Sequence, residues 1–242
     1  MNRTVLGMGF GLALIVALPA AADPVRDVLT PNGEIAPALR QLMVLTAISF
    51  VPAALIAMTS FTRIVIVLSM LRSALGLAQT PPNVVIITLA LFLTFFSMAP
   101  VLDAVKTRGV DPWMDKQVST EVALHDGFEP LKAFMLRQTR EGDLRAVVSM
   151  AGAAQPRTME AVQPLHLVPA FMLSELRTAF QIGFVIFLPF LLIDLVVASI
   201  LMALGMIMVP PATVSLPLKV LLFLLINGWV LVAQAVLGSY RH

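Results

Sequence analysis

The chain has 242 residues, of which 59% are hydrophobic and only 12% are charged, and its mean hydropathy is +0.93. An ordinary soluble domain has about a quarter of its residues charged, and a disordered chain is poor in hydrophobic residues, so the composition excludes both classes. A net charge of +2 provides no basic surface for nucleic acid. Because cysteine is absent, disulfides, thiolate nucleophiles and cysteine-ligated metals are excluded as well.

Most of the charge lies in one part of the sequence. Nineteen of the 30 charged side chains lie between Asp103 and Arg177, nine of them basic and ten acidic. The other 167 residues carry only eleven charges. We therefore predict an all-α integral membrane protein in which one polar, water-facing segment separates two apolar parts.

The first 22 residues have the pattern of a secretory signal peptide. A basic residue precedes an apolar run of 14 residues, Val5–Leu18, which is too short to span a membrane. Small residues then lead to a predicted cleavage site between Ala22 and Asp23. An uncleaved anchor helix is the alternative interpretation. Residues 23–40 would follow as a short periplasmic lead-in.

Four long apolar stretches come next, and each is long enough for the helix of about 20 residues that crosses the hydrocarbon layer. They are Gln41–Ser60, Val84–Leu102, Phe180–Val209 and Val214–Gly238. Turns at 76–83 and 210–213 contain double prolines, which stop helices because proline lacks a backbone donor. The predicted order is a transmembrane hairpin at 41–102, a polar helical segment at 103–178 and a second transmembrane hairpin at 179–242.

Basic residues predict the orientation. The connection between the first two spans contains Arg63 and Arg72 and no acidic residue, which places it in the cytoplasm by the positive-inside rule. The polar segment has nearly balanced charge and can therefore be translocated. Combined with a cleaved signal peptide, these features predict four crossings, with both mature ends and the polar segment in the periplasm.

The polar segment has the periodicity of helices. One predicted helix has an apolar face made of Phe128, Leu131, Phe134 and Met135. Asp143 is placed to cap the next helix. Pro169 is predicted to open the helical approach to the third span.

Four ionisable residues lie in or beside the apolar stretches, namely Arg63, Glu175, Asp194 and Lys219. A carboxylate near the bilayer centre costs about 2.5–3.5 kcal/mol, so we expect these residues to make intramembrane or intersubunit polar contacts. In a simple hairpin that turns at Pro210, Asp194 and Lys219 lie at different depths, because Asp194 is 16 residues from the turn. We therefore expect Asp194 to bind the first hairpin or a neighbouring subunit. Snorkelling is the alternative for Lys219.

The sequence contains no signature of an enzyme. Phosphate-binding loops, zinc-protease motifs and nucleophile elbows are absent, and a diaspartyl membrane protease needs two intramembrane acids rather than one. We predict no catalytic residue, no metal and no cofactor. A lone intramembrane acid also fits a proton-coupled small-solute membrane transporter using Asp194, and this class is the alternative.

A short methionine-containing segment, Met206, Ile207 and Met208, precedes the double proline of the second turn. Methionine is flexible and polarizable and fills irregular gaps, so core filling is the simplest interpretation for a single chain. In a symmetric ring, the same residues from every subunit would converge on one axis and form an apolar constriction.

Three motifs resemble the FliP family of flagellar export-gate proteins. They are Met58–Leu68 with its continuation to Asn83, Pro169–Phe184, and Pro217–Lys219 followed by Asn227-Gly228-Trp229. Because the length, the signal peptide and the order of the spans agree as well, the resemblance covers essentially the whole chain. The injectisome counterpart is similar but typically lacks a cleavable signal, which favours the flagellar branch.

The resemblance implies a non-enzymatic, pore-forming structural subunit of the flagellar type III protein export gate in the inner membrane. It implies a pentamer that binds Q- and R-type gate subunits and the B- and A-type membrane proteins of the export apparatus. Unfolded flagellar subunits would pass through this gate, which is lifted largely out of the bilayer. The family's methionine gasket corresponds to Met206, Ile207 and Met208. Isoleucine stands where a third methionine is usual, and its χ1 torsion is stiffer.

Overall fold

The structure is a computed structural model, and it describes residues 35–156, 158 and 161–240. The predicted signal peptide, with its cleavage site at Ala22 and Asp23, and most of the lead-in lie outside the described residues. The chain divides into two compact units between residues 53 and 54. The described residues contain helices and no strand, which confirms the predicted all-α class.

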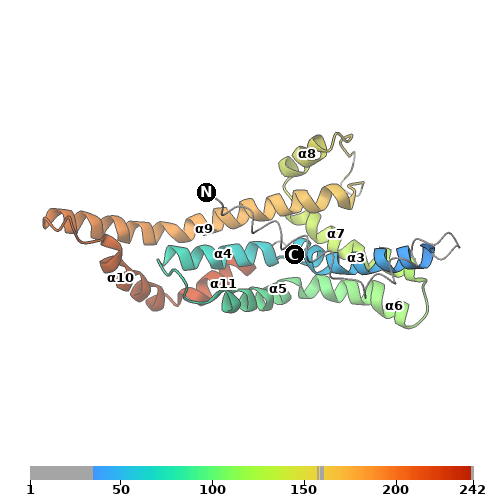
Figure 1. Cartoon of the computed structure of the whole chain (residues 1–242), viewed down its shortest axis with the longest axis horizontal. Coiled ribbons are helices and arrows are strands. Elements are labelled where there is room, and N and C mark those ends of the chain that lie inside the picture. Colours follow the sequence, from blue (N-terminus) through green and yellow to red (C-terminus); the bar gives the residue numbers. More distant parts are fainter. Residues whose placement is uncertain (1–34, 157, 159–160, 241–242) are drawn as a thin grey trace, which may run out of the picture. The chain divides into compact units, whose positions relative to one another are not determined.

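Figure 1 shows the helices of the described residues. In chain order they are α3 (Ile35–Ala57), α4 (Phe61–Ala74), α5 (Asn83–Val105), the π-helix η1 (Lys106–Val110), α6 (Asp111–Met114), α7 (Thr120–Gln138), α8 (Glu141–Met150), α9 (Pro164–Ala203), α10 (Pro211–Leu225) and α11 (Gly228–Gly238). Helix α3 contains most of the first predicted span and begins six residues earlier than predicted.

Two helices in the described part of the chain are long and apolar enough to cross a membrane. They are Asn83–Met114, which combines α5, η1 and α6, and the 40-residue helix α9. Helices α10 and α11 make a third span if the pair, bent by 66°, is counted as one. The predicted four crossings are therefore not confirmed by the described residues.

Helix α9 is longer than the sequence pattern indicated. It begins at Pro164 and continues through Pro169, so the prediction that Pro169 opens this helix is wrong by five residues. Pro164 is the residue in the first turn, where a missing backbone donor has no cost. Buried neighbours hold the helix together at Pro169, because Leu167, Ala170 and Phe171 are all fully buried. As a result, the predicted boundary at residues 178 and 179 lies inside one helix.

Helix α4 is at the centre of the second unit. Four of its apolar residues, Ile64, Val67, Leu68 and Leu71, are at most 1% exposed. Their spacing of three or four residues places them on one face. The sequence predicted that the segment containing Arg63 and Arg72 connects two spans. It is instead a packed helix with an apolar face of its own.

Helices α4 and α9 run side by side in the same direction. Arg63, near the start of α4, lies beside Glu175 of α9, and Met70 lies beside Gly183 further along both helices. The approach at Gly183 is close, since a Cβ atom there would come within 2.3 Å of the Met70 sulfur. Helix α5 returns alongside α4 (Figure 1), so α4 is held from two sides.

The polar segment folds onto the same unit. Phe134 and Met135 of α7 are fully buried and Phe128 and Leu131 are half-buried, which confirms the predicted apolar face. Asp143 does not cap α8, whose N-cap residue is Arg140.

Asp143 instead binds α9. Its carboxylate accepts a hydrogen bond from the Ser174 hydroxyl at 2.8 Å and pairs with Arg177 at 3.0 Å. The residue lies in the first turn of α8, where its short side chain points toward a neighbouring helix. The prediction that Asp143 caps α8 is therefore wrong, because its carboxylate makes a tertiary contact with α9 instead.

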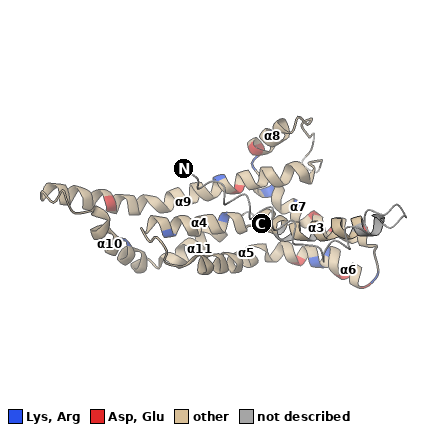
Figure 2. Cartoon of the chain, viewed as in Figure 1, with Lys and Arg blue, Asp and Glu red and all other residues tan. Residues whose placement is uncertain are grey.

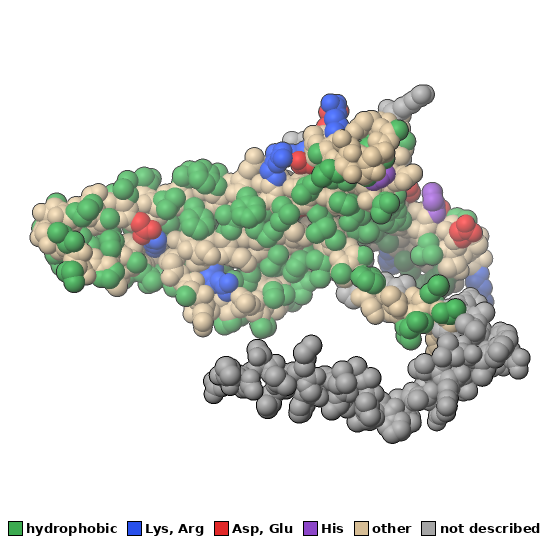
Figure 3. Space-filling model, turned by 45° about the horizontal axis from the view of Figure 1, so that its top comes forward, with side chains coloured by type: hydrophobic (Ala, Val, Ile, Leu, Met, Phe, Trp, Pro, Cys, Tyr) green, Lys and Arg blue, Asp and Glu red, His purple; other side chains and the backbone are tan. Residues whose placement is uncertain are grey.

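Charge and apolar surface are separated within this unit. Figure 2 shows charged side chains gathered around α6, α8 and the first half of α9, and few along the rest of α9. Hydrophobic side chains cover much of the face drawn in Figure 3. On the second half of α9, Phe184, Leu192 and Leu195 are each at least 60% exposed. Apolar surface of this extent marks a face made for lipid or for another protein.

The backbones of η1 and α7 approach each other at Gly109. A Cβ atom on Gly109 would lie 2.8 Å from the Gly127 Cα and 2.9 Å from the Ala123 carbonyl oxygen. Both neighbours are backbone atoms, so neither can rotate away. Gly109 is therefore required by the packing of these two helices.

We predict that Gly109→Ala destabilises the chain by about 1–3 kcal/mol, as overpacking of a tight contact does. Thermal unfolding of the full chain in mild detergent measures the effect. Gly142→Ala is the matched control, because beyond its chain neighbours and its own helix backbone no atom lies within 4 Å of the added methyl group. The control should be neutral or slightly stabilising, by at most about 1 kcal/mol. Equal melting temperatures for the two variants would contradict the close approach.

Candidate functional site

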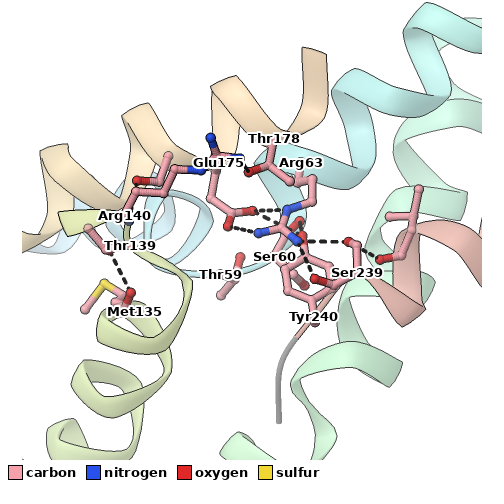
Figure 4. A network of polar contacts seen from close by, with 12 residues as sticks. Thr59, Ser60, Arg63, Met135, Thr139, Arg140, Glu175, Thr178, Ser239 and Tyr240 are labelled. Carbon is pink, nitrogen blue, oxygen red and sulfur yellow. Dashed lines mark hydrogen bonds and ion pairs between the residues drawn. The ribbon is translucent and has the colours of Figure 1, made fainter. Parts of the chain in front are cut away.

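A buried ion pair joins α4 to α9 (Figure 4). The Arg63 Nε donates to Glu175 Oε2 at 2.9 Å, and the Arg63 Nη2 donates to Glu175 Oε1. The two side chains are 2% and 0% exposed. Two parallel charge-assisted hydrogen bonds fix both the distance and the orientation of the partners. These two predicted polar residues therefore bind each other within one chain.

The residues that follow α11 complete this cluster. The Arg63 Nη1 donates to the Ser239 carbonyl oxygen at 3.1 Å and to its hydroxyl at 2.9 Å. The Arg63 guanidinium lies 3.9 Å from the centre of the Tyr240 ring, a favourable cation–π distance. The Tyr240 hydroxyl lies 3.0 Å from the Ser60 carbonyl oxygen and 3.2 Å from Glu175 Oε2. Each side-chain nitrogen of Arg63 and each carboxylate oxygen of Glu175 thus has at least one hydrogen-bond partner.

Tyr240 acts as a neutral donor in this cluster. Burial, together with the charge of Glu175, raises the pKa of the Tyr240 hydroxyl well above its ordinary value. Its ring also packs against Phe134 of α7, with ring centres 6.1 Å apart. The cluster therefore links α4, α7, α9 and the segment after α11 at a single point. We call Arg63, Glu175, Ser239 and Tyr240 the arginine cluster.

Sequence reasoning identified Arg63 and Glu175 but missed Ser239 and Tyr240. One signal was available, since Tyr240 is the single tyrosine of the chain and follows an apolar helix. A tyrosine in such a place commonly uses its hydroxyl to bind a buried polar group.

A second ion pair joins α9 to α10. The Lys219 ammonium donates to Asp194 Oδ2 at 2.6 Å, and the Ser215 hydroxyl donates to Asp194 Oδ1 at 2.6 Å. The Lys219 ammonium also lies 3.4 Å from the Ala74 carbonyl oxygen, at the last residue of α4. The Lys219 side chain is 8% exposed and that of Asp194 is 39% exposed. Lys219 does not snorkel to water, because its charge is satisfied inside the chain.

The prediction that Asp194 and Lys219 lie at different depths is wrong. It assumed that α9 continues to Pro210, whereas α9 ends at Ala203 and residues 204–210 form the connection. Asp194 therefore lies nine residues before the end of α9, and Lys219 eight residues after the start of α10. At 1.5 Å per residue these distances are about 14 and 12 Å, so the two charges meet.

The connection between α9 and α10 exposes its apolar residues. Gly205 has a φ of +76°, which lets the chain turn away from α9 without strain. Met206, Ile207 and Met208 are 44%, 85% and 93% exposed. They do not fill the core of this chain, so the interpretation of these residues as core-filling side chains is wrong. We call these three residues the methionine loop.

The site has the chemistry of binding and packing. In the described part of the chain no three His, Asp or Glu side chains come close enough together to hold a metal ion. Long apolar helices, ion pairs that join them and an exposed apolar loop define a helical membrane protein.

Comparison with known proteins identifies the family. Residues 44–236 match the model of the FliP family, so the chain belongs to that family.

Relatives agree over most of the chain. The flagellar biosynthetic protein FliP of Pectobacterium carotovorum subsp. carotovorum is 51% identical over 236 residues, covering 96% of this chain and 90% of the relative. The protein of the same name from Bacillus subtilis (strain 168) is 48% identical over 202 residues, covering 84% and 91%. That from Aquifex aeolicus (strain VF5) is 47% identical over 212 residues, covering 87% and 89%. The resemblance inferred from the three motifs is confirmed.

We predict that Glu175→Gln destabilises the chain by about 3–5 kcal/mol, because it leaves the buried Arg63 charge uncompensated. Unfolding of the full chain in detergent, followed by circular dichroism, measures the change. Glu141→Gln makes the same carboxylate-to-amide exchange in the exposed Glu141–Arg145 pair, where both side chains are about two-thirds exposed. This control should change stability by less than about 1 kcal/mol. A small effect for both variants would show that the arginine cluster is dispensable.

Proposed function

We propose that this chain is a pore-forming structural subunit of the flagellar type III protein export gate, through which unfolded flagellar subunits cross the inner membrane. The observation that carries the proposal is the exposed methionine loop, presented between two apolar helices of a FliP-family chain. The role is structural and non-enzymatic. A structural role in a membrane assembly explains why the loop and the helices beside it expose apolar side chains, which a single chain in water would bury.

The methionine loop has the properties of a compliant seal. Its side chains are apolar, so a ring of them excludes water from a narrow opening and blocks ions. Methionine is unbranched and polarizable, so the same ring can adapt to the varied side chains of a passing chain. Ile207 keeps the bulk but is stiffer at χ1, so we expect this seal to be slightly less adaptable than one of three methionines.

Assembly into a ring gives the exposed apolar helix faces a partner. We propose a pentamer that binds the Q- and R-type gate subunits and the B- and A-type membrane proteins of the export apparatus. The two ion pairs support this arrangement because they satisfy their charges inside each chain. The outer faces of α5 and α9 are then nearly free of charge and can pack on lipid before assembly and on sister subunits afterwards.

The separation of charge along the chain supports an orientation. We propose that the polar segment and the mature N-terminus, released by cleavage between Ala22 and Asp23, lie in the periplasm of the flagellar basal body. The methionine loop would then lie toward the cytoplasm, together with the turn between α4 and α5.

A proton-coupled transporter that uses Asp194 is not favoured. Both carboxylate oxygens of Asp194 already accept hydrogen bonds, from Lys219 and Ser215. Curated relatives at about half identity carry the name of a flagellar biosynthetic protein rather than of a carrier.

We predict that the double variant Met206→Gly with Met208→Gly leaks ions and small solutes when produced in bacterial membranes, because it removes the two compliant side chains of the seal. Uptake of a small fluorescent solute measures the leak. Met114→Gly with Met150→Gly is the matched control, since both residues are exposed methionines at the ends of helices outside the loop. A correctly assembled loop variant that leaks no more than its control would exclude the seal.

We also predict that native mass spectrometry of the full chain in mild detergent reveals a discrete five-copy species. Added Q- and R-type subunits should bind this species and raise its mass. A stable monomer or dimer that binds neither subunit would contradict the proposed ring, and the proposed seal would then be excluded as well.

A further inference from the structure

We propose that the Asp194–Lys219 pair is a positioning clamp, which sets the register of α9 against α10 and so holds the methionine loop at one height. This inference rests on the proposed function only for the consequence that the loop seals a pore. The clamp itself is a statement about the geometry of one chain.

The two arms of the connection are nearly equal in length when measured from the clamp. Asp194 lies nine residues before the end of α9 and Lys219 eight residues after the start of α10. Each arm therefore extends about 12–14 Å beyond the ion pair before the chain turns. Neither arm has another charged residue, so this pair is the only ionic tie available to it. The height of the loop thus follows from which residues meet at the clamp.

An aromatic contact one turn away repeats the same register. Phe190 lies four residues before Asp194, and Phe223 lies four residues after Lys219. Their rings pack with centres 6.4 Å apart, and both side chains are buried. A slip of α10 by one helical turn, about 5.4 Å, would break the aromatic contact and the ion pair together. The register is therefore specified by two contacts of different chemistry.

The clamp also attaches the hairpin to α4. The Lys219 ammonium lies 3.4 Å from the Ala74 carbonyl oxygen at the C-terminal end of α4, where the helix dipole favours a cation. Helix α4 is bound to α9 by the arginine cluster near its other end. Lys219 therefore fixes α10 against both α9 and α4. Through this contact, the position of the methionine loop relative to α4, at the centre of the unit, is fixed as well.

A variant in which both Asp194 and Lys219 are neutral tests the effect of the clamp on register without the misfolding that an unpaired buried charge causes. Asp194→Asn alone leaves the buried Lys219 charge without its counter-ion and risks misfolding. The double variant Asp194→Asn with Lys219→Met leaves no uncompensated charge, so it should fold and assemble. Ser215→Ala is a milder second variant, because it removes one hydrogen bond to Asp194 and no charge.

The test measures register directly. The chain has no cysteine, so Ile200→Cys on α9 and Leu218→Cys on α10 give two unique, exposed positions for spin labels. Labelled full chain is diluted with unlabelled chain and the distance distribution is recorded by pulsed electron paramagnetic resonance. We expect a single narrow distance in the parent and a broadened distribution with a second component in the double neutral variant. Ser215→Ala should broaden it less. Glu141→Gln, in an exposed pair on α8, is the control and should match the parent.

The solute leak is then measured on the same variants. A leak in the double neutral variant, with the five-copy species intact, supports the clamp as the positioning element of the seal. An unchanged distance distribution in that variant overturns the clamp. A broadened distribution without a leak overturns its positioning role, provided that the methionine-to-glycine variant leaks. If the methionine-to-glycine variant does not leak, the proposed seal fails and the distance distribution alone decides the clamp.

Discussion

The interior of this chain depends on the rule that a charge removed from water must meet an opposite charge. Arg63 is 2% exposed, and its guanidinium is satisfied by Glu175, Ser239 and Tyr240. Removing a charge from water costs several kcal/mol unless partners in good geometry offset it. The cluster therefore brings α4, α9 and the segment after α11 to one point, and the apolar faces of those helices pack around it.

The same rule explains why the outside of the unit can be so apolar. Among the described residues, the two buried cations, Arg63 and Lys219, find their counter-ions within the chain, so the outer faces of α5 and α9 need no polar partner. Such faces are compatible with lipid and with a sister subunit, which suits a protein proposed to insert first and assemble later. The exposed methionine loop continues the apolar surface of α9, and its methionine side chains are more flexible than the other apolar side chains of that surface.

Much of this organisation could be predicted from the sequence. Composition and charge segregation predicted an all-α membrane protein, and the three long motifs predicted the family. The apolar face of α7, with Phe134 and Met135 at its centre, followed from helical spacing alone. These features extend over many residues or depend only on neighbours within a helix, so the amino-acid sequence alone is sufficient to find them.

Tertiary structure alone decided which residues meet. Sequence reasoning flagged Arg63, Glu175, Asp194 and Lys219 as residues in need of polar contacts, because a charge in an apolar run is costly wherever it lies. It could not pair them, since a contact across 112 residues depends on how helices pack. Asp194 and Lys219 were misassigned because the depth of each depends on where α9 ends. That point, at Ala203, is set by the turn at Gly205 and by packing against α10, neither of which hydropathy records.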